Sequence, residues 1–395
     1  MALFLFIVLT LSWFLFFLKW RESVERYDTA PPEPQDAAPS SLHPPADTGD
    51  LAMPFRPDET TAAPPGFDFS ELGLRPHAGR SNRAALESLR LELEALPADE
   101  AIAQLLDWLE SGIDLDTGIW FELSAGGHLA GAPSFRTFVI DQIARIDPVL
   151  AAEQAETAFR NELPRSADEF ALHLRNYGQH ALDIDPAAPD QLKTQIQRLI
   201  ANPDWVNEPG VGFLEAFDVW VAIESIDALP TLTQWLGQGP HDPVLGHAAY
   251  LTLERLIDRS NTETLTALTD WSDSRLSGDL AKRRAALWAR APLEQSAGVA
   301  LAESYLLNPA LTPTERAAFY AQVPNLHFSH SHNLLSHGVY PDANTIRARL
   351  QSTREWLIQR QRDTRFSTDK AEIETALQRL QGILGSPSMT QADQD

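Results

Sequence analysis

Cysteine is absent from the 395 residues of this sequence. The chain therefore forms no disulfide, has no thiolate nucleophile, and lacks the sulfur ligand common in structural zinc sites. Positive charge is scarce as well, because 31 Lys and Arg residues oppose 55 Asp and Glu residues, for a formal net charge of −24. Such a charge repels the phosphates of nucleic acids. We therefore expect no nucleic-acid partner.

Motifs for nucleotide binding and hydrolysis are also missing. The stretch Ser124 to Ser134 places Gly126, Gly127 and Gly131 ahead of a predicted helix, where backbone amides can bind an anion. However, the Lys-Ser/Thr pair of a P-loop does not follow its last glycine, and no G-x-S-x-G elbow occurs. We interpret this stretch as a loop, and expect no catalytic residue, no cofactor and no enzymatic activity.

The longest apolar run stands at the start of the chain, from Ala2 to Leu18, and Lys19 and Arg21 follow it. As a helix it spans roughly 26 Å, close to the ~30 Å core of a bilayer. No basic residue precedes it and no small-x-small site closes it, which favours an uncleaved anchor at 1–20 over a cleaved signal peptide. The positive-inside rule then predicts a single-pass protein of an inner or plasma membrane, with residues 2–18 in the lipid bilayer and the C-terminal domain in the cytoplasm.

Helical periodicity covers almost all of residues 67–384. Leu86, Leu89 and Leu93, for example, fall on one helical face, and prolines mark the turns between such segments. Residues 21–66 are rich in Pro, Ala and Asp, which predicts a disordered linker, and residues 385–395 read as a disordered tail. The predicted fold class is therefore all-α.

A spacing of 36 residues recurs within this helical part. Leu229, Leu232 and Trp235 return as Leu265, Leu268 and Trp271. A fixed period of this length is typical of stacked helical repeats. A short helical hairpin has one apolar stripe, which it buries only against a neighbouring hairpin. These six residues are therefore predicted to form the inter-repeat core.

The first copy, 228–258, resembles a HEAT repeat. The resemblance rests on Leu229, Pro230, Leu232 and Leu236 in a first helix, Asp242 and Val244 at the turn, and Ala248, Ala249, Leu253 and Ile257 in a second helix. Leu245 stands where the family usually carries an Arg. The second copy, 264–291, is less regular, and two amphipathic helices over 343–384 suit a terminal cap. The resemblance implies a right-handed α-solenoid of stacked hairpins. A tetratricopeptide array has a period of 34 and a different pattern, while an irregular helical bundle is the alternative.

Four histidines lie close together at 327, 330, 332 and 337. The imidazoles of His327, His330 and His332 are candidate ligands for Zn²⁺ or a similar metal. This pattern indicates an alternative function, a metal-dependent enzyme or metal-binding protein built on the loop from His327 to His337. The other interpretation is a loop between hairpins whose histidines form ordinary hydrogen bonds.

A solenoid offers a surface rather than a pocket. The favoured function is therefore a membrane-tethered scaffold or adaptor that binds another protein. A structural spacer without a specific partner is the third hypothesis.

Overall fold

The computed structural model describes residues 69–124, 126–160, 164–237, 243–272, 276, 278–326, 333–336 and 341–385. All of them belong to the unit Phe55–Asp395. These residues are mostly helical, which confirms the predicted all-α class. The described α-helices are α2 (Arg80–Ala95), α3 (Ala98–Glu110), α4 (Phe135–Ile146), α5 (Pro148–Arg160), α6 (Ala167–Ala181), α7 (Ala188–Ile200), α8 (Pro203–Asn207), α9 (Val211–Glu215), α10 (Asp218–Ala222), α11 (Leu229–Gly237), α12 (Pro243–Ala267), α13 (Thr269–Ser272), α14 (Gly278–Trp288), α15 (Ser296–Leu306), α16 (Pro313–Gln322), α17 (Ala343–Arg362) and α18 (Lys370–Leu384).

Shorter elements join these helices. Three are 3-10 helices: η1 (Phe69–Leu72), η2 (Ile226–Ala228) and η3 (Thr364–Asp369). The strands β1 (Glu122–Leu123) and β2 (Leu129–Gly131) form a small antiparallel hairpin, in which β1 ends just before the Gly-rich stretch and β2 lies in it. Polar residues cap several helices, as at Ser134, whose hydroxyl accepts a hydrogen bond from Thr137 N at the start of α4. Such caps satisfy amides that have no partner inside the helix.

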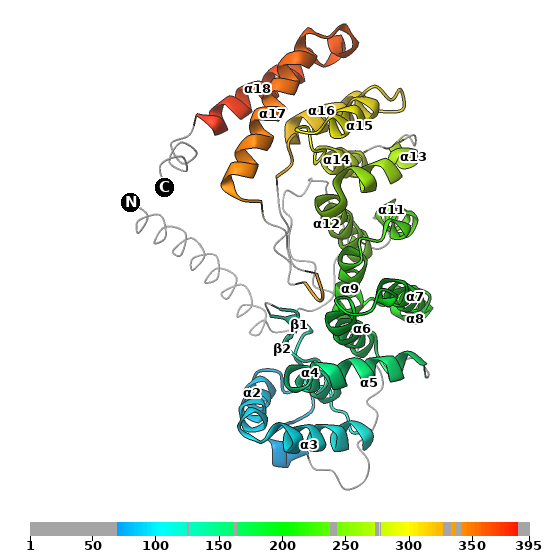
Figure 1. Cartoon of the computed structure of the whole chain (residues 1–395), viewed down its shortest axis with the longest axis vertical. Coiled ribbons are helices and arrows are strands. Elements are labelled where there is room, and N and C mark those ends of the chain that lie inside the picture. Colours follow the sequence, from blue (N-terminus) through cyan, green and yellow to red (C-terminus); the bar gives the residue numbers. More distant parts are fainter. Residues whose placement is uncertain are drawn as a thin grey trace, which may run out of the picture. The chain divides into compact units, whose positions relative to one another are not determined.

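Helices pack mainly against near neighbours in the sequence. Consecutive pairs such as α5 with α6 and α11 with α12 are in contact, and so are next-but-one pairs such as α14 with α16 (Figure 1). A continuous core of Leu, Ile, Val, Ala and aromatic side chains runs between them. Most of the contacts between helices therefore join elements that are close in the sequence.

The two copies of the 36-residue repeat fold differently in the structure. The first copy folds as α11 and α12, which pack on each other. In the second copy Leu265 belongs to the end of α12 itself, and Trp271 lies in the short α13. Between Asp258 and Thr264 the sequence has no Pro or Gly to end the helix, so α12 runs on into the second copy. Of the six predicted core residues, Leu229, Leu232, Trp235, Leu265 and Leu268 are buried, and Trp271 is half-buried against the core. Their role between repeats stays a prediction.

Buried ion pairs connect successive parts of the helix series. Arg290, which follows α14, donates to Glu254 at 2.7 Å and to Asp258 at 2.8 Å, both in α12. Arg255 of α12 in turn donates to Asp218 of α10. These pairs supply polar contacts between the helices.

The predicted localisation needs correction. Within the described ranges no helix combines the length and the apolar character that a membrane crossing requires. Even α12, the longest described helix, carries the charged residues Glu254, Arg255 and Asp258. This finding contradicts a single-pass protein of an inner or plasma membrane. The predicted anchor at 1–20, the linker at 21–66 and the tail after Gly385 lie outside the described residues.

Candidate functional site

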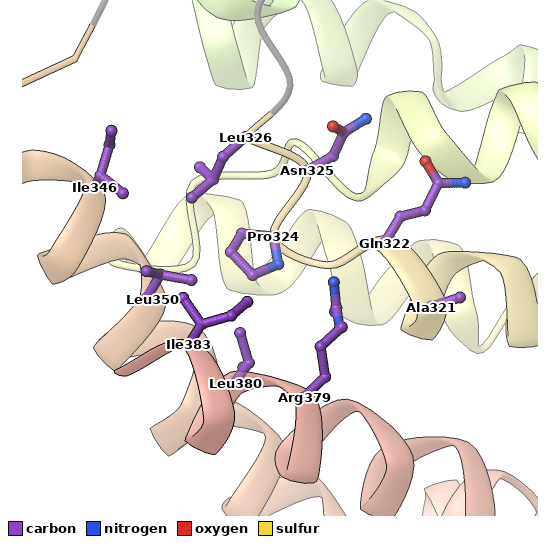
Figure 2. A pocket seen from close by; sticks show the side chains of 10 residues that line it. All are labelled: Ala321, Gln322, Pro324, Asn325, Leu326, Ile346, Leu350, Arg379, Leu380 and Ile383. Atoms are coloured by element: carbon purple, nitrogen blue, oxygen red, sulfur yellow. The ribbon is translucent and has the colours of Figure 1, made fainter. Parts of the chain in front are cut away.

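A groove of about 460 Å³ lies where α18 and α17 meet the end of α16. Figure 2 shows Ile346, Leu350, Leu380 and Ile383 gathered on one side of it, with Arg379 reaching toward Pro324. The apolar lining comes from two helices that are neighbours in the sequence and from the turn after α16. This groove is our candidate functional site.

Local hydrogen bonds fix the walls of the groove. Asp342 caps α17 by accepting a hydrogen bond from Thr345 N at 2.7 Å, so that Ile346 and Leu350 project from one helical face. Asn325 anchors the turn after α16: its backbone amide donates to Ala289 O at 2.8 Å and its side-chain amide donates to Ala286 O at 3.0 Å. The groove is therefore formed before any partner arrives.

Arg379 supplies the positive charge of the groove. Its Nη2 donates to the carbonyls of Tyr320 and Val323, while its Nε has no hydrogen-bond partner among the described residues. Burial lowers the pKa of Arg379 below its ordinary value, and among the described residues no carboxylate offsets this effect. An arginine stays protonated near neutral pH despite such a shift, so the group is a partly desolvated cation.

The helix beside the groove is basic, unlike the chain as a whole. Within α17 the charged side chains are Arg347, Arg349, Arg354, Arg360 and Arg362 against a single Glu355. Two of these arginines have acidic partners in α15 and just before it: Arg360 pairs with Glu303 at 2.5 Å and Arg349 with Glu294 at 3.3 Å. A positive stretch thus lies within a chain of net charge −24.

The predicted metal ligands His327, His330 and His332 lie outside the described residues, as does His337. In the part of the chain that the structure does describe, no group of three or more His, Asp or Glu side chains is placed to hold a metal ion. The metal hypothesis therefore stays a prediction.

The Gly-rich stretch has a structural role. Gly127 has a φ of +78°, and a Cβ there would lie 2.2 Å from the carbonyl oxygen of Leu334. Its own carbonyl accepts a hydrogen bond from Arg175, which is fully buried and also pairs with Asp141 at 2.5 Å. Burial alone would raise the pKa of Asp141, but Arg175, His128 and Arg145 together hold it below its usual range. This cluster ties the β-hairpin to α4 and α6.

The segment Asn333–Ser336, which we call the strap, lies against the same region. Leu335 N and Ser336 N donate to Asp218 Oδ2 at 2.6 and 2.7 Å, and Ser336 Oγ donates to Asp218 Oδ1 at 2.5 Å. The side chain of Leu335 packs over Gly178 of α6. Nothing in the local sequence indicates this contact, because Asp218 and Ser336 are 118 positions apart.

A second carboxyl accompanies the strap. Burial, followed by the negative charge of Asp218, raises the pKa of Glu215 from its ordinary 4.5 to about 7, against the opposing effect of Arg255. Shifted carboxyls often mark functional sites, but they also occur in structural networks. Here both oxygens of the neighbouring Asp218 already accept hydrogen bonds from the strap, so we interpret Glu215 and Asp218 as a structural pair.

No family model, no curated protein and no solved structure matches this chain. The function is therefore inferred from the chain's own residues.

Proposed function

We propose that this chain is a helical-repeat scaffold or adaptor, a right-handed α-solenoid of HEAT-like hairpins whose surface binds another protein. The observation that carries the proposal is the groove beside α17 and α18, which is preformed and lined by apolar side chains. A concave site of this size, lined mainly by apolar side chains with a few polar groups, is the usual place for a ligand or partner to bind.

Two further features support the repeat architecture. Helices contact their next and next-but-one neighbours, as units do when they stack in one direction. In addition, the Arg255–Asp218 and Arg290–Glu254 pairs join residues 37 and 36 positions apart, about one repeat length. The same polar contact therefore recurs from one predicted unit to the next.

Affinity purification with the full chain as bait tests the proposal. We expect one or a few proteins to be enriched over an unrelated acidic bait, and each to bind again when both proteins are purified. A bait that enriches nothing, or whose purified candidates fail to bind, would leave the structural-spacer hypothesis in its place.

A further inference from the structure

We propose that the groove formed by the end of α16 with α17 and α18 binds a peptide segment of a partner protein, with apolar side chains for the groove and an Asp or Glu for Arg379. This inference rests on the proposed scaffold function and assigns it a place and a partner chemistry.

The apolar part of the occupant follows from the lining. Leu350 and Leu380 are buried at the base, whereas Ile383 keeps 37% of its surface exposed at the rim. A volume of about 460 Å³ falls within the range of pockets that hold one ligand or a few side chains. Grooves between helices take the apolar face of a peptide in just this manner.

The acidic part follows from Arg379. Neighbouring arginines of the same region are neutralised: Arg284 pairs with Glu315 at 2.6 Å and Arg316 with Asp369 at 3.1 Å. Arg379 forms no such ion pair within the described part of the chain, and its contacts are with backbone carbonyls. A carboxylate brought by a partner would provide the missing counter-charge, and charge-assisted hydrogen bonds of this type are strong.

The wider charge distribution points the same way. An acidic peptide is repelled by a chain of net charge −24, so its approach depends on local positive charge. Arginines outnumber the single acidic residue of α17, and this helix lines the groove, so the local charge is positive. Nucleic acids fit less well, because their phosphates gain nothing from the Ile346, Leu350 and Ile383 side chains.

The test selects peptides from a phage-displayed library of random 16-residue sequences on the immobilised full chain. We expect enriched peptides to combine two or three apolar residues with an Asp or Glu. Synthetic copies should bind the chain in solution, as measured by fluorescence anisotropy. Replacing their acidic residue by Asn or Gln should weaken binding roughly tenfold, as expected for a charged pair.

Two variants assign the binding to the groove. Ile383→Asp places a like charge at the rim and should reduce binding of the enriched peptides at least tenfold. The matched control Ile184→Asp changes a side chain that is 67% exposed in the turn after α6, away from the groove residues, and should bind as the wild type does. Circular dichroism should show the same helical content for all variants.

A charge reversal gives a result that misfolding does not produce. On Arg379→Glu the selection should return Lys or Arg in place of Asp or Glu, with the apolar residues retained. The assignment would be overturned if the wild type enriched no common pattern. It would also be overturned if Ile383→Asp selected the same peptides as the wild type, or if Arg379→Glu still selected acidic peptides.

The remaining outcomes separate this inference from the scaffold proposal. If Ile383→Asp and Arg379→Glu still capture the wild-type partner, the scaffold stands and the groove assignment is wrong. If light scattering shows a dimer that Ile383→Asp dissociates, the occupant is a second copy of the chain, which also overturns the assignment. If neither peptides nor proteins bind, both proposals fall.

Discussion

Arg290 and Glu254, 36 positions apart, form an ion pair in which both side chains are almost completely buried, with Arg290 Nη2 2.7 Å from Glu254 Oε1. Removing water from two charges is costly, and only close geometry with further hydrogen bonds offsets that cost. Arg290 meets this condition through a second acceptor, Asp258, at 2.8 Å. The apolar echo of the sequence is thus accompanied by a polar contact of the same spacing.

A double-mutant cycle tests this contact. We expect Arg290→Leu to lower the free energy of unfolding by about 3–5 kcal/mol, because it removes the cation that pairs with both Glu254 and Asp258. Combined with Glu254→Leu, the loss should be smaller than the sum of the single losses, with a coupling of about 1–3 kcal/mol. Urea denaturation provides the measurement.

The exposed pair Arg160–Glu156 of α5 is the matched control for that cycle. Its coupling should be about 0.3–0.5 kcal/mol, as for other surface pairs on helices. Equal coupling in the two cycles would contradict the structural role given to Arg290.

Gly127 and Gly126 form a natural comparison at the β-hairpin. Both have positive φ values, +78° and +94°, but a Cβ at Gly126 meets nothing within 4 Å, whereas one at Gly127 collides with Leu334 O. Gly126→Ala should cost about 1–2 kcal/mol of stability for its backbone conformation alone. Gly127→Ala should cost about 2 kcal/mol more, since the strap must also shift. Thermal unfolding of both variants checks the difference, and equal losses would mean that the strap does not contact Gly127.

The stability of the chain should depend on pH through Glu215. Its pKa is about 7 in the folded chain and near 4.5 when unfolded, so the folded state holds this proton longer. Ionisation therefore opposes folding as the pH rises from 4.5 through 7. Glu215→Gln, which cannot ionise, should be more stable than the wild type by about 1–3 kcal/mol at about pH 8, and equally stable below about pH 4.5.

For Glu215 the quantity to measure is the difference in the free energy of unfolding between Glu215→Gln and the wild type, because other groups titrate in the same pH range. Burial raises the pKa of Asp168 to about 6, which has the same sign, and lowers that of His173 to about 4, which makes acid destabilising. Both effects are common to the two proteins and cancel. A constant difference between about pH 4.5 and pH 8 would show that Glu215 titrates normally in the folded chain.

Metal analysis tests the histidine hypothesis directly. The scaffold proposal expects the purified full chain to contain much less than one zinc per molecule by mass spectrometry, and the variant His330→Ala/His332→Ala to behave identically. Stoichiometric zinc in the wild type that this double variant loses would instead favour the metal-binding function. Dialysis against a chelator should leave the melting temperature unchanged if no structural metal is present.

The sequence was sufficient for the helical class, because apolar periodicity and proline-marked turns are local signals. Leu86, Leu89 and Leu93 share a buried face for this reason. The sequence was not sufficient to predict that α12 continues into the second copy and includes Leu265. That continuation depends on the absence of a residue that would end the helix, and not on a repeated pattern.

The groove could not be predicted from the sequence, because residues far apart in the chain line it. Leu326 and Leu380 line it together, yet no local pattern connects residues so far apart. One signal was available: the arginines of α17 form a basic helix in an acidic chain, which identifies a region of interest but not its shape. The contact between Asp218 and the strap had no signal at all, since a Ser and a Leu are ordinary loop residues.

That contact also constrains the order in which the protein assembles during synthesis. Asp218 leaves the ribosome 118 residues before Ser336, so α10 is complete long before the strap that binds it exists. Once Arg255 has been added to the chain, Asp218 has a nearby cation, while the strap's amides are still to be made. If translation stopped between these two positions, the nascent chain would have its middle helices but not the strap that covers Asp218 and Gly178. Exposed surface of this kind on an incomplete chain is what chaperones bind.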